Sequence, residues 1–387
     1  MVDCLAFDYD DLSELGQGDE GTVFAIHGDE LLAVKMLEPV PPDLEARLEA
    51  MLALAPASWG GDAHDPRHLF LAWPGAGARW VYEDTVSGLV LPRISHDVSL
   101  VSALGPDGRS PRQPARYLDW VRMAKGIAYI VERLHEADVV VGDMSPRNIL
   151  VTREGLVTLV DVDSMQFHFR GRMFPATRFT PEYAPPEYAS ATVQYTKDGD
   201  RFGLAVLLVQ ILLGGDHPFE GAATAGSNTT LVDNIRTGRN RIASPASLMP
   251  VPRQPPGKIL PREIHALARR AFSATRERPS AAEWHAALTN MWVRLQTCSS
   301  NVNHQFAQEL LACPWCAGPD LFPPSAPSDA APRPRGGRRV DPAAGVPSNL
   351  TVHRSPPSAS RPPGALAPLG FILLIALVLL IAIGATP

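Results

Sequence analysis

Three oxygen-bearing side chains, Asp143, Asn148 and Asp161, have types and spacings suited to phosphoryl transfer. Asp143 and Asn148 are five residues apart in the stretch VVGDMSPRN, and Asp161 comes thirteen residues later, at the end of an apolar run. One carboxylate can orient an attacking hydroxyl, while a carboxamide and a second carboxylate hold Mg²⁺ or Mn²⁺. Each residue alone also suits a bland role in a turn, a cap or a solvated strand end. The three together predict a metal- and ATP-dependent phosphotransferase.

A glycine-rich stretch, LGQGDEGTV, precedes these residues and places Gly16, Gly18 and Gly21 ahead of Val23. Glycines let a strand–turn–strand backbone approach phosphate oxygens without an intervening Cβ atom. Glycine-rich turns are common, so this motif alone is weak evidence. It gains weight from the lysine-bearing strand that comes after it in the chain.

That strand, LLAVK, ends in Lys35, whose ammonium could neutralise the α- and β-phosphates of ATP. A lone lysine on a strand is more often solvated surface. Glu49, in the helix expected over residues 42–55, could pair with Lys35 and hold it in place. Glu45, one turn earlier, is the alternative, and the sequence does not decide between them.

The surrounding elements change character along the chain. Residues 10–95 predict short strands and one helix, with turn residues between two strands in 22–37 and further apolar strands at 68–73 and 88–94. A hairpin is expected at 149–163. Helices are expected over the later amphipathic or apolar segments, 117–137, 200–215, 261–273 and 280–296. This order predicts an α+β protein with two lobes.

Residues 10 to about 293 resemble a eukaryotic-like protein kinase domain. Besides the site motifs, FTPEYAPPE resembles the family's segment ending at Glu187. DGDRFGLAV resembles the helix whose Asp200 supports the catalytic loop, and RERPSAAEW the motif whose Arg278 pairs with Glu187. The resemblance implies a two-lobed fold, with a strand-rich N-lobe at 10–94 and a helical C-lobe at 95–293.

The resemblance also assigns roles to individual residues. Asp143 would be the catalytic base, and Asn148 and Asp161 the magnesium ligands. Gly16, Gly18 and Gly21 would cover the phosphates that Lys35 and Glu49 clamp, with Val23 beside them. Leu91 would be the gatekeeper, with Pro92 to Ile94 after it facing adenine.

Several positions depart from the family pattern. Gly142 replaces an arginine that pairs with a phosphorylated activation loop, so activity without loop phosphorylation is expected. Val141 replaces a largely structural histidine. Asp163 replaces the glycine of Asp-Phe-Gly; it could add a carboxylate near the metals or cap the next turn, and capping is favoured.

Sequence features disagree on which hydroxyl-bearing residue of a substrate would accept the phosphate. Serine/threonine kinases carry a lysine where Ser145 stands, whereas tyrosine kinases often carry an arginine where Arg147 stands. Thr180 occupies the place of the threonine that touches the base in serine/threonine kinases, and Arg147 can supply a cation to the γ-phosphate. These features favour Ser/Thr transfer to a protein substrate. Two alternatives remain, a small-molecule phosphotransferase of the aminoglycoside or choline kinase type and a nucleotide-binding pseudokinase.

A cysteine-rich segment comes after the last expected helix, within residues 294–318. Cys298, His304, Cys313 and Cys316 offer the N/S ligand set of a tetrahedral structural zinc site. A redox pair, or buried cysteines beside a surface histidine, are the alternatives. A reducing cytoplasmic setting favours Zn²⁺.

The rest of the chain bears on location. The net charge of −6 gives no reason to expect a nucleic-acid partner. Residues 319–364 are rich in Pro, Ala, Ser, Arg and Gly and predict an extended linker. Residues 365–385 form an apolar run long enough to span a bilayer. With arginines on its N-terminal side, this run predicts a C-terminal single-pass anchor in the cell membrane with the kinase facing the cytoplasm.

Overall fold

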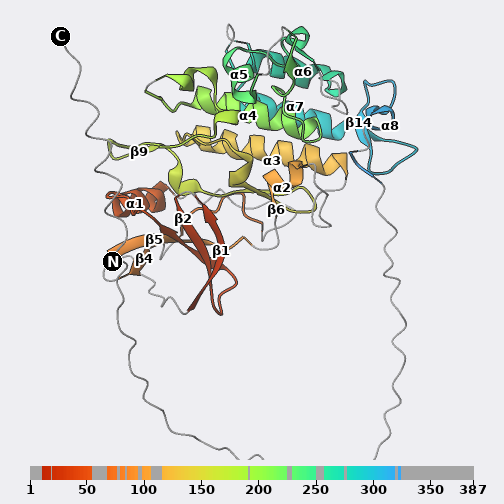
Figure 1. The fold of residues 1–387 in the computed structure, drawn as a ribbon. Coiled ribbons are helices and arrows are strands. Elements are labelled where there is room, and N and C mark those ends of the chain that lie inside the picture. Colours follow the sequence, from red (N-terminus) through yellow and green to blue (C-terminus); the bar gives the residue numbers. More distant parts are fainter. Residues whose placement is uncertain are drawn as a thin grey trace, which may run out of the picture. The chain divides into compact units, whose positions relative to one another are not determined.

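The computed structural model describes residues 11–18, 20–54, 68–75, 79–82, 85–94, 98–105, 116–190, 192–224, 229–249, 257–273, 277–318 and 321–323. These residues lie in one compact unit. They form a strand-rich N-lobe and then a helical C-lobe (Figure 1). The predicted α+β, two-lobed class is therefore confirmed.

The N-lobe is built on a five-stranded antiparallel sheet of order β1-β2-β3-β5-β4. One face packs on helix α1, where Leu44 and Leu48 meet Leu37, Leu89 and Leu91. The elements are β1 (Leu12–Gly18), β2 (Gly21–Ile26), β3 (Leu32–Leu37), α1 (Leu44–Leu54), β4 (Arg79–Tyr82) and β5 (Thr85–Pro92). Lys35 therefore lies in the middle strand of the sheet, flanked by β2 and β5.

The strand expected at residues 68–73 is wrong. Leu71 makes only an isolated bridge with Leu159, while Trp73 donates from its indole Nε1 to the Met51 carbonyl at 2.9 Å. The run is apolar because it is buried against the C-lobe core, and burial alone does not distinguish a strand from irregular backbone. The strand that completes the sheet is β4.

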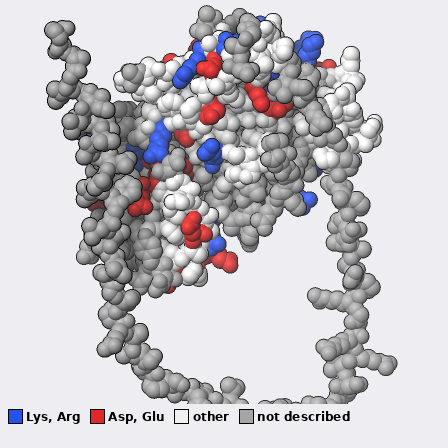
Figure 2. Space-filling view, in the orientation of Figure 1, with Lys and Arg blue, Asp and Glu red and all other residues white. Residues whose placement is uncertain are grey.

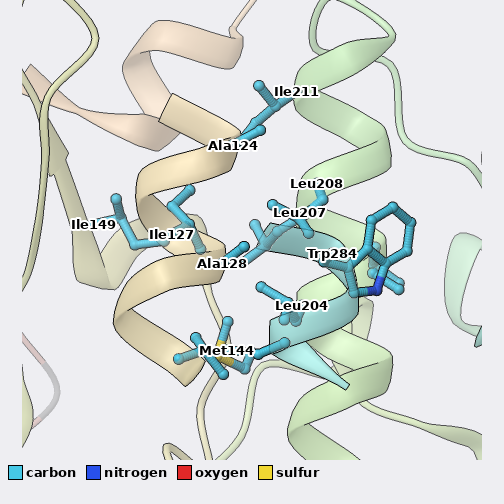
Figure 3. Close-up of a cluster of buried hydrophobic side chains, with 14 of the residues drawn as sticks. Ala124, Ile127, Ala128, Met144, Ile149, Leu204, Leu207, Leu208, Ile211 and Trp284 are labelled. Atoms are coloured by element: carbon cyan, nitrogen blue, oxygen red, sulfur yellow. The ribbon is translucent and has the colours of Figure 1, made fainter. Parts of the chain in front are cut away.

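The C-lobe is organised around α3 (Tyr117–Glu136), which packs beside α4 (Lys197–Leu212) and α7 (Ala281–Val293). Figure 3 shows Ala124 of α3 beside Ile211 of α4 and Ala128 beside Leu207 and Leu208, with Trp284 nearby. Small residues on α3 let the two helices approach closely. α4 is buried along almost its whole length, which explains its continuous apolar sequence.

The remaining elements surround this helical core. The predicted hairpin within 149–163 is present as β7 (Ile149–Val151) and β8 (Val157–Leu159), and the helices expected at 261–273 and 280–296 are α6 and α7. The others are β6 (Val98–Ser99), α2 (Leu100–Leu104), β9 (Phe167–Phe169), β10 (Arg172–Phe174), β11 (Ala222–Ala223), α5 (Leu231–Arg236), β12 (Leu248–Met249), α6 (Arg262–Ala271), β13 (Leu295–Thr297), β14 (Gln305–Ala307) and α8 (Pro314–Ala317).

Within the described ranges, no helix is both long and apolar enough to cross a membrane. The predicted anchor at residues 365–385 lies outside those ranges, as does the predicted linker apart from 321–323. Figure 2 shows acidic and basic side chains interspersed on the visible face, in keeping with the mild net charge.

Candidate active site and metal centre

The loop that carries Asp143 is held in place by hydrogen bonds to a side chain of α4. The Asp200 carboxylate, 1% exposed, accepts hydrogen bonds from the backbone N–H groups of Val141 (2.7 Å) and Gly142 (2.9 Å). The His135 ring at the end of α3 contacts the same carboxylate, with Nε2 at 2.9 Å from Oδ2. These bonds satisfy backbone donors that would otherwise be buried without partners. The support role that the resemblance implies for Asp200 is present, and His135 is a participant that no sequence motif indicated.

Asp143 and Asn148 lie side by side in the loop. The Asn148 side-chain amide donates to Asp143 Oδ2 at 3.1 Å and to its backbone carbonyl at 3.2 Å. Asp143 Oδ1 accepts from the backbone N–H of Thr180 at 2.8 Å. Thr180 therefore touches the expected base, but through its main chain. Asp143 is oriented from both sides, with one oxygen on each neighbour.

Lys35 reaches across from the sheet to the turn after β8. Its ammonium donates to Asp161 Oδ1 and to both carboxylate oxygens of Asp163, each of the latter at 2.9 Å. Burial lowers the pKa of Lys35, but the carboxylates of Asp163 and Asp161 more than offset this effect and raise it. The ammonium thus stays charged inside the protein. Two predicted site residues, Lys35 and Asp161, are therefore in contact.

The pairing predicted between Lys35 and Glu49 is wrong, and so is the Glu45 alternative. Glu49 Oε1 is 3.7 Å from Arg170 Nη1, and Glu45 Oε1 is 3.5 Å from Arg79 Nη1. Both glutamates are on the exposed side of α1, because the buried side is taken by Leu44, Arg47, Leu48, Ala50 and Met51. Asp163, for which a capping role was favoured, occupies the place beside Lys35 instead.

The glycine-rich turn lies close to these carboxylates. Oxygens of Glu20, Asp161 and Asp163 are within 4.8 Å of one another. Glu20 also pairs with Arg178 of the activation segment at 2.9 Å. Burial and the neighbouring Asp161 raise the pKa of Glu20. This glutamate was not singled out from the sequence, although it stands within the glycine motif.

The three motif glycines have different surroundings. Among the described residues, no atom comes within 4 Å of where a Gly16 Cβ would lie, and the nearest to Gly18 is 3.9 Å away, so the space beside both glycines is open. At Gly21, with φ +153°, a Cβ would lie 1.8 Å from the Met36 carbonyl oxygen. Gly21 is therefore required by the close pairing of β2 and β3, independently of any phosphate.

The other predicted nucleotide contacts lie on the same sheet. Val23 is opposite Lys35 in the β2–β3 register, and Leu91 is opposite Ala33 in β5. Leu91 is buried against α1, and Ile94 lies just after the end of β5, half-buried.

Two further residues of the predicted site lie in the loop before Asn148. Arg147 is exposed beside Asn148. Ser145 is buried, and its hydroxyl accepts from the Arg147 N–H and caps the short turn. The roles of these residues stay predictions.

The activation segment packs directly against position 142. Gly142 has φ +80°, and a Cβ there would lie 2.7 Å from the Cβ of Ala176 and 3.5 Å from the Tyr195 ring. A side chain is excluded both by this backbone conformation and by the neighbouring segment.

The end of the activation segment is held by Arg278. Its guanidinium pairs with Glu187 through two bonds of 2.6 and 2.9 Å, and also with Asp198 at 2.7 Å.

Comparison with known proteins agrees with this geometry. Residues 109–293 match the family described as "Protein kinase domain". Residues 109–293 therefore resemble a protein kinase domain. The chain is 30% identical over 317 residues to "Protein kinase YegI" of Escherichia coli (strain K12), a match that covers 79% of this chain and 48% of that protein. It is 32% identical over 125 residues to "Serine/threonine-protein kinase AfsK" of Streptomyces coelicolor, covering 32% of this chain and 15% of AfsK.

A third relative of the kinase domain is the "cAMP-dependent protein kinase catalytic subunit" of Arthrobotrys oligospora, 28% identical over 154 residues, or 39% of this chain and 26% of that protein. The chain spans about half the length of the YegI relatives that it matches.

The four predicted zinc ligands converge after α7. Cys298 Sγ is 3.5 Å from Cys316 Sγ, and His304 Nδ1 is 3.5 Å from Cys316 Sγ and 3.7 Å from Cys313 Sγ. Ligand atoms of a tetrahedral zinc site, bonded at roughly 2.0 to 2.3 Å, must stand at about these separations. The Ser300 N–H donates to Cys298 Sγ and lowers the pKa of that thiol to about 6. The cluster therefore fits Zn²⁺, which would serve a structural role.

The ligand-bearing segment is packed into the kinase domain. Trp315 and Phe322 belong to the C-lobe core, and their rings contact Tyr117 at centroid distances of 4.7 and 5.4 Å. The start of α3 is bound as well: Tyr117 N–H donates to the Asn303 carbonyl at 3.1 Å and Leu118 N–H to the Gln305 side chain at 2.9 Å. The segment that carries the cluster thus supplies acceptors for the first turn of α3.

We expect activity to be independent of phosphorylation at Thr177, because Gly142 offers no cation to a loop phosphate. Thr177→Ala should keep kinase activity within about twofold of the unmodified chain, since surface substitutions have small effects. Phosphoryl transfer by Thr177→Ala, compared with the unmodified chain both as purified and after phosphatase treatment, measures this directly. A collapse of activity in Thr177→Ala would contradict the expectation.

The second prediction concerns the cysteine cluster. The purified chain should contain about one zinc per molecule, and Cys316→Ser should lower both the zinc content and the thermal midpoint, the latter by more than about 5 °C. The midpoint should fall because α3 loses part of its N-terminal support. Ser299→Ala, next to a ligand but outside the cluster, is the control. Zinc-free protein with an unchanged midpoint in chelator would refute the metal site.

Proposed function

We propose that this chain is an ATP- and magnesium-dependent protein kinase that transfers the γ-phosphate to serine or threonine of a protein substrate. The observation that carries the proposal is that Lys35 of the N-lobe bonds Asp161 and that Asn148 bonds Asp143 in the C-lobe. A bond of 2.9 Å from the Val160 N–H to the Asn148 carbonyl joins the two pairs. The match to a protein kinase domain and the relatives named as protein kinases support the same conclusion.

Each residue has a definite part in the reaction. Asp143 accepts the proton of the substrate hydroxyl as it attacks; Thr180 N–H and the Asn148 amide hold its carboxylate in place. Lys35 neutralises phosphate oxygens, and the open backbone of Gly16 and Gly18 donates N–H groups to them. Asn148 and Asp161 would hold Mg²⁺, which would neutralise charge developing on the phosphates. Catalysis is then mostly positioning and electrostatic stabilisation.

A protein acceptor is favoured over a small molecule by the activation segment. Arg278 ties Glu187 and Asp198 together, so that the segment from Thr180 onward is fixed beside Asp143. Small-molecule phosphotransferases of the aminoglycoside or choline kinase type lack this arrangement. Ser/Thr preference is supported by Thr180 beside the base and by the Ser/Thr kinases among the relatives.

We further propose that residues 365–385 tether the kinase to a membrane, on the support of their uninterrupted apolar sequence. Membrane fractionation of the full chain, compared with a chain lacking this segment, tests that part of the proposal.

The decisive experiment is transfer of labelled phosphate from ATP to a generic protein substrate by the purified chain. Transfer should require Mg²⁺ and fall by more than about 100-fold in Asp143→Ala and in Lys35→Ala, because one loses the base and the other a phosphate contact. Asp233→Ala, in the capping box of α5 and outside the site, is the control. Nucleotide binding without transfer would favour a pseudokinase, and transfer only to an aminoglycoside or choline would favour the small-molecule alternative.

A further inference from the structure

The partner of Lys35 differs from the one that the family pattern implies. Leu44, Leu48 and Met51 of α1 are buried at 3%, 0% and 0% exposure, whereas the side chains of Glu45 and Glu49 are 64% and 60% exposed. Turning the helix to bring Glu49 to Lys35 would carry these apolar side chains out of the core. The packing of α1 therefore keeps both glutamates on its exposed side, paired with Arg79 and Arg170.

Asp163 fills that place with strong geometry. Both of its carboxylate oxygens accept from Lys35 Nζ at 2.9 Å, and the two side chains are only 5% and 7% exposed. Charge-assisted bonds between buried partners are stronger than exposed ones, and breaking such a pair leaves an uncompensated charge. Asp161 also accepts from Lys35, but its side chain is 30% exposed, and it is the predicted magnesium ligand. Asp163 is the carboxylate free to hold Lys35 while Asp161 binds metal.

Helix α1 reaches this turn through Arg47, on its buried face. The Arg47 guanidinium donates to the carbonyl of Asp163 at 2.9 Å, to that of Met165 at 2.8 Å and to that of Pro175 at 2.7 Å. It lies over the rings of Phe167 and Phe174, at 5.4 and 5.6 Å from their centroids. The helix thereby holds the backbone of the turn that carries Asp163 and the base of the activation segment.

We propose that Asp163 is the positioning residue that aims Lys35 at the nucleotide phosphates, and that Arg47 links it to α1 in place of the glutamate–lysine pair. The inference rests on the proposed function, because it assigns Lys35 to a nucleotide. Its consequence is that one short turn carries both a metal ligand, Asp161, and the anchor of the phosphate-binding lysine. Movements of α1 then act on the site through backbone carbonyls instead of through a side-chain ion pair.

The test compares Asp163→Asn with Glu49→Gln in the full chain, using two readouts. The first is turnover of a generic protein substrate; the second is the Kd for a non-hydrolysable ATP analogue with Mg²⁺. Asp163→Asn should lower kcat/KM for ATP about 100-fold, as expected for a misplaced catalytic group, and raise the Kd about tenfold. Asp163→Glu, which restores the charge, should recover part of both losses. Glu49→Gln should leave both readouts within about twofold.

The outcomes separate the two claims. A loss in Glu49→Gln as large as that expected for Asp163→Asn would overturn the inference, even if Asp163→Asn failed to fold. Unchanged turnover and Kd in a folded Asp163→Asn would overturn it as well; thermal midpoints establish folding. If the unmodified chain binds nucleotide without turnover, the proposed function fails. In that case, a higher Kd in Asp163→Asn with an unchanged Kd in Glu49→Gln still supports the positioning role of Asp163.

Discussion

A single buried ammonium joins the two lobes at the site. Lys35 leaves the middle strand of the N-lobe sheet and is neutralised by Asp161 and Asp163 in a turn of the C-lobe. Removing a charge from water costs several kcal/mol unless the charge is paired and hydrogen-bonded. The N-lobe sheet and the C-lobe turn must therefore keep their relative positions for the Lys35 ion pairs to persist. Glu20 approaches from the glycine-rich turn and Arg47 from α1, and both are positioned around the same turn.

The C-lobe supplies the rigidity on which this contact rests. α3 and α4 pack through small residues, and α4 in turn presents Asp200 to the backbone of the loop that carries Asp143. The residues after α7 continue the same core through Trp315 and Phe322 and supply acceptors to the start of α3. The loop that carries Asp143 is therefore held by buried helices of the C-lobe. The lysine proposed to bind the nucleotide, Lys35, comes from the N-lobe sheet and contacts the C-lobe turn.

The chain order of motifs was enough to predict the two lobes and the hairpin before Asp161, because these depend on local patterns. The helical spacing of Leu44, Leu48 and Met51 also indicates which face of α1 is buried. Arg47 lies on that same face. Family likeness favoured Glu49 instead. The bond from Lys35 to Asp163 was not predictable, since it joins residues 128 positions apart and depends on how the turn meets the sheet.

A double-mutant cycle on Lys35 and Asp163 tests the central claim most directly, with the Kd for a magnesium-loaded ATP analogue as the readout. If Asp163 acts on nucleotide through Lys35, Lys35→Met combined with Asp163→Asn should weaken binding no more than Lys35→Met alone, so the cycle should show strong coupling. Losses that multiply, as for two independent sites, would contradict the claim that one residue positions the other.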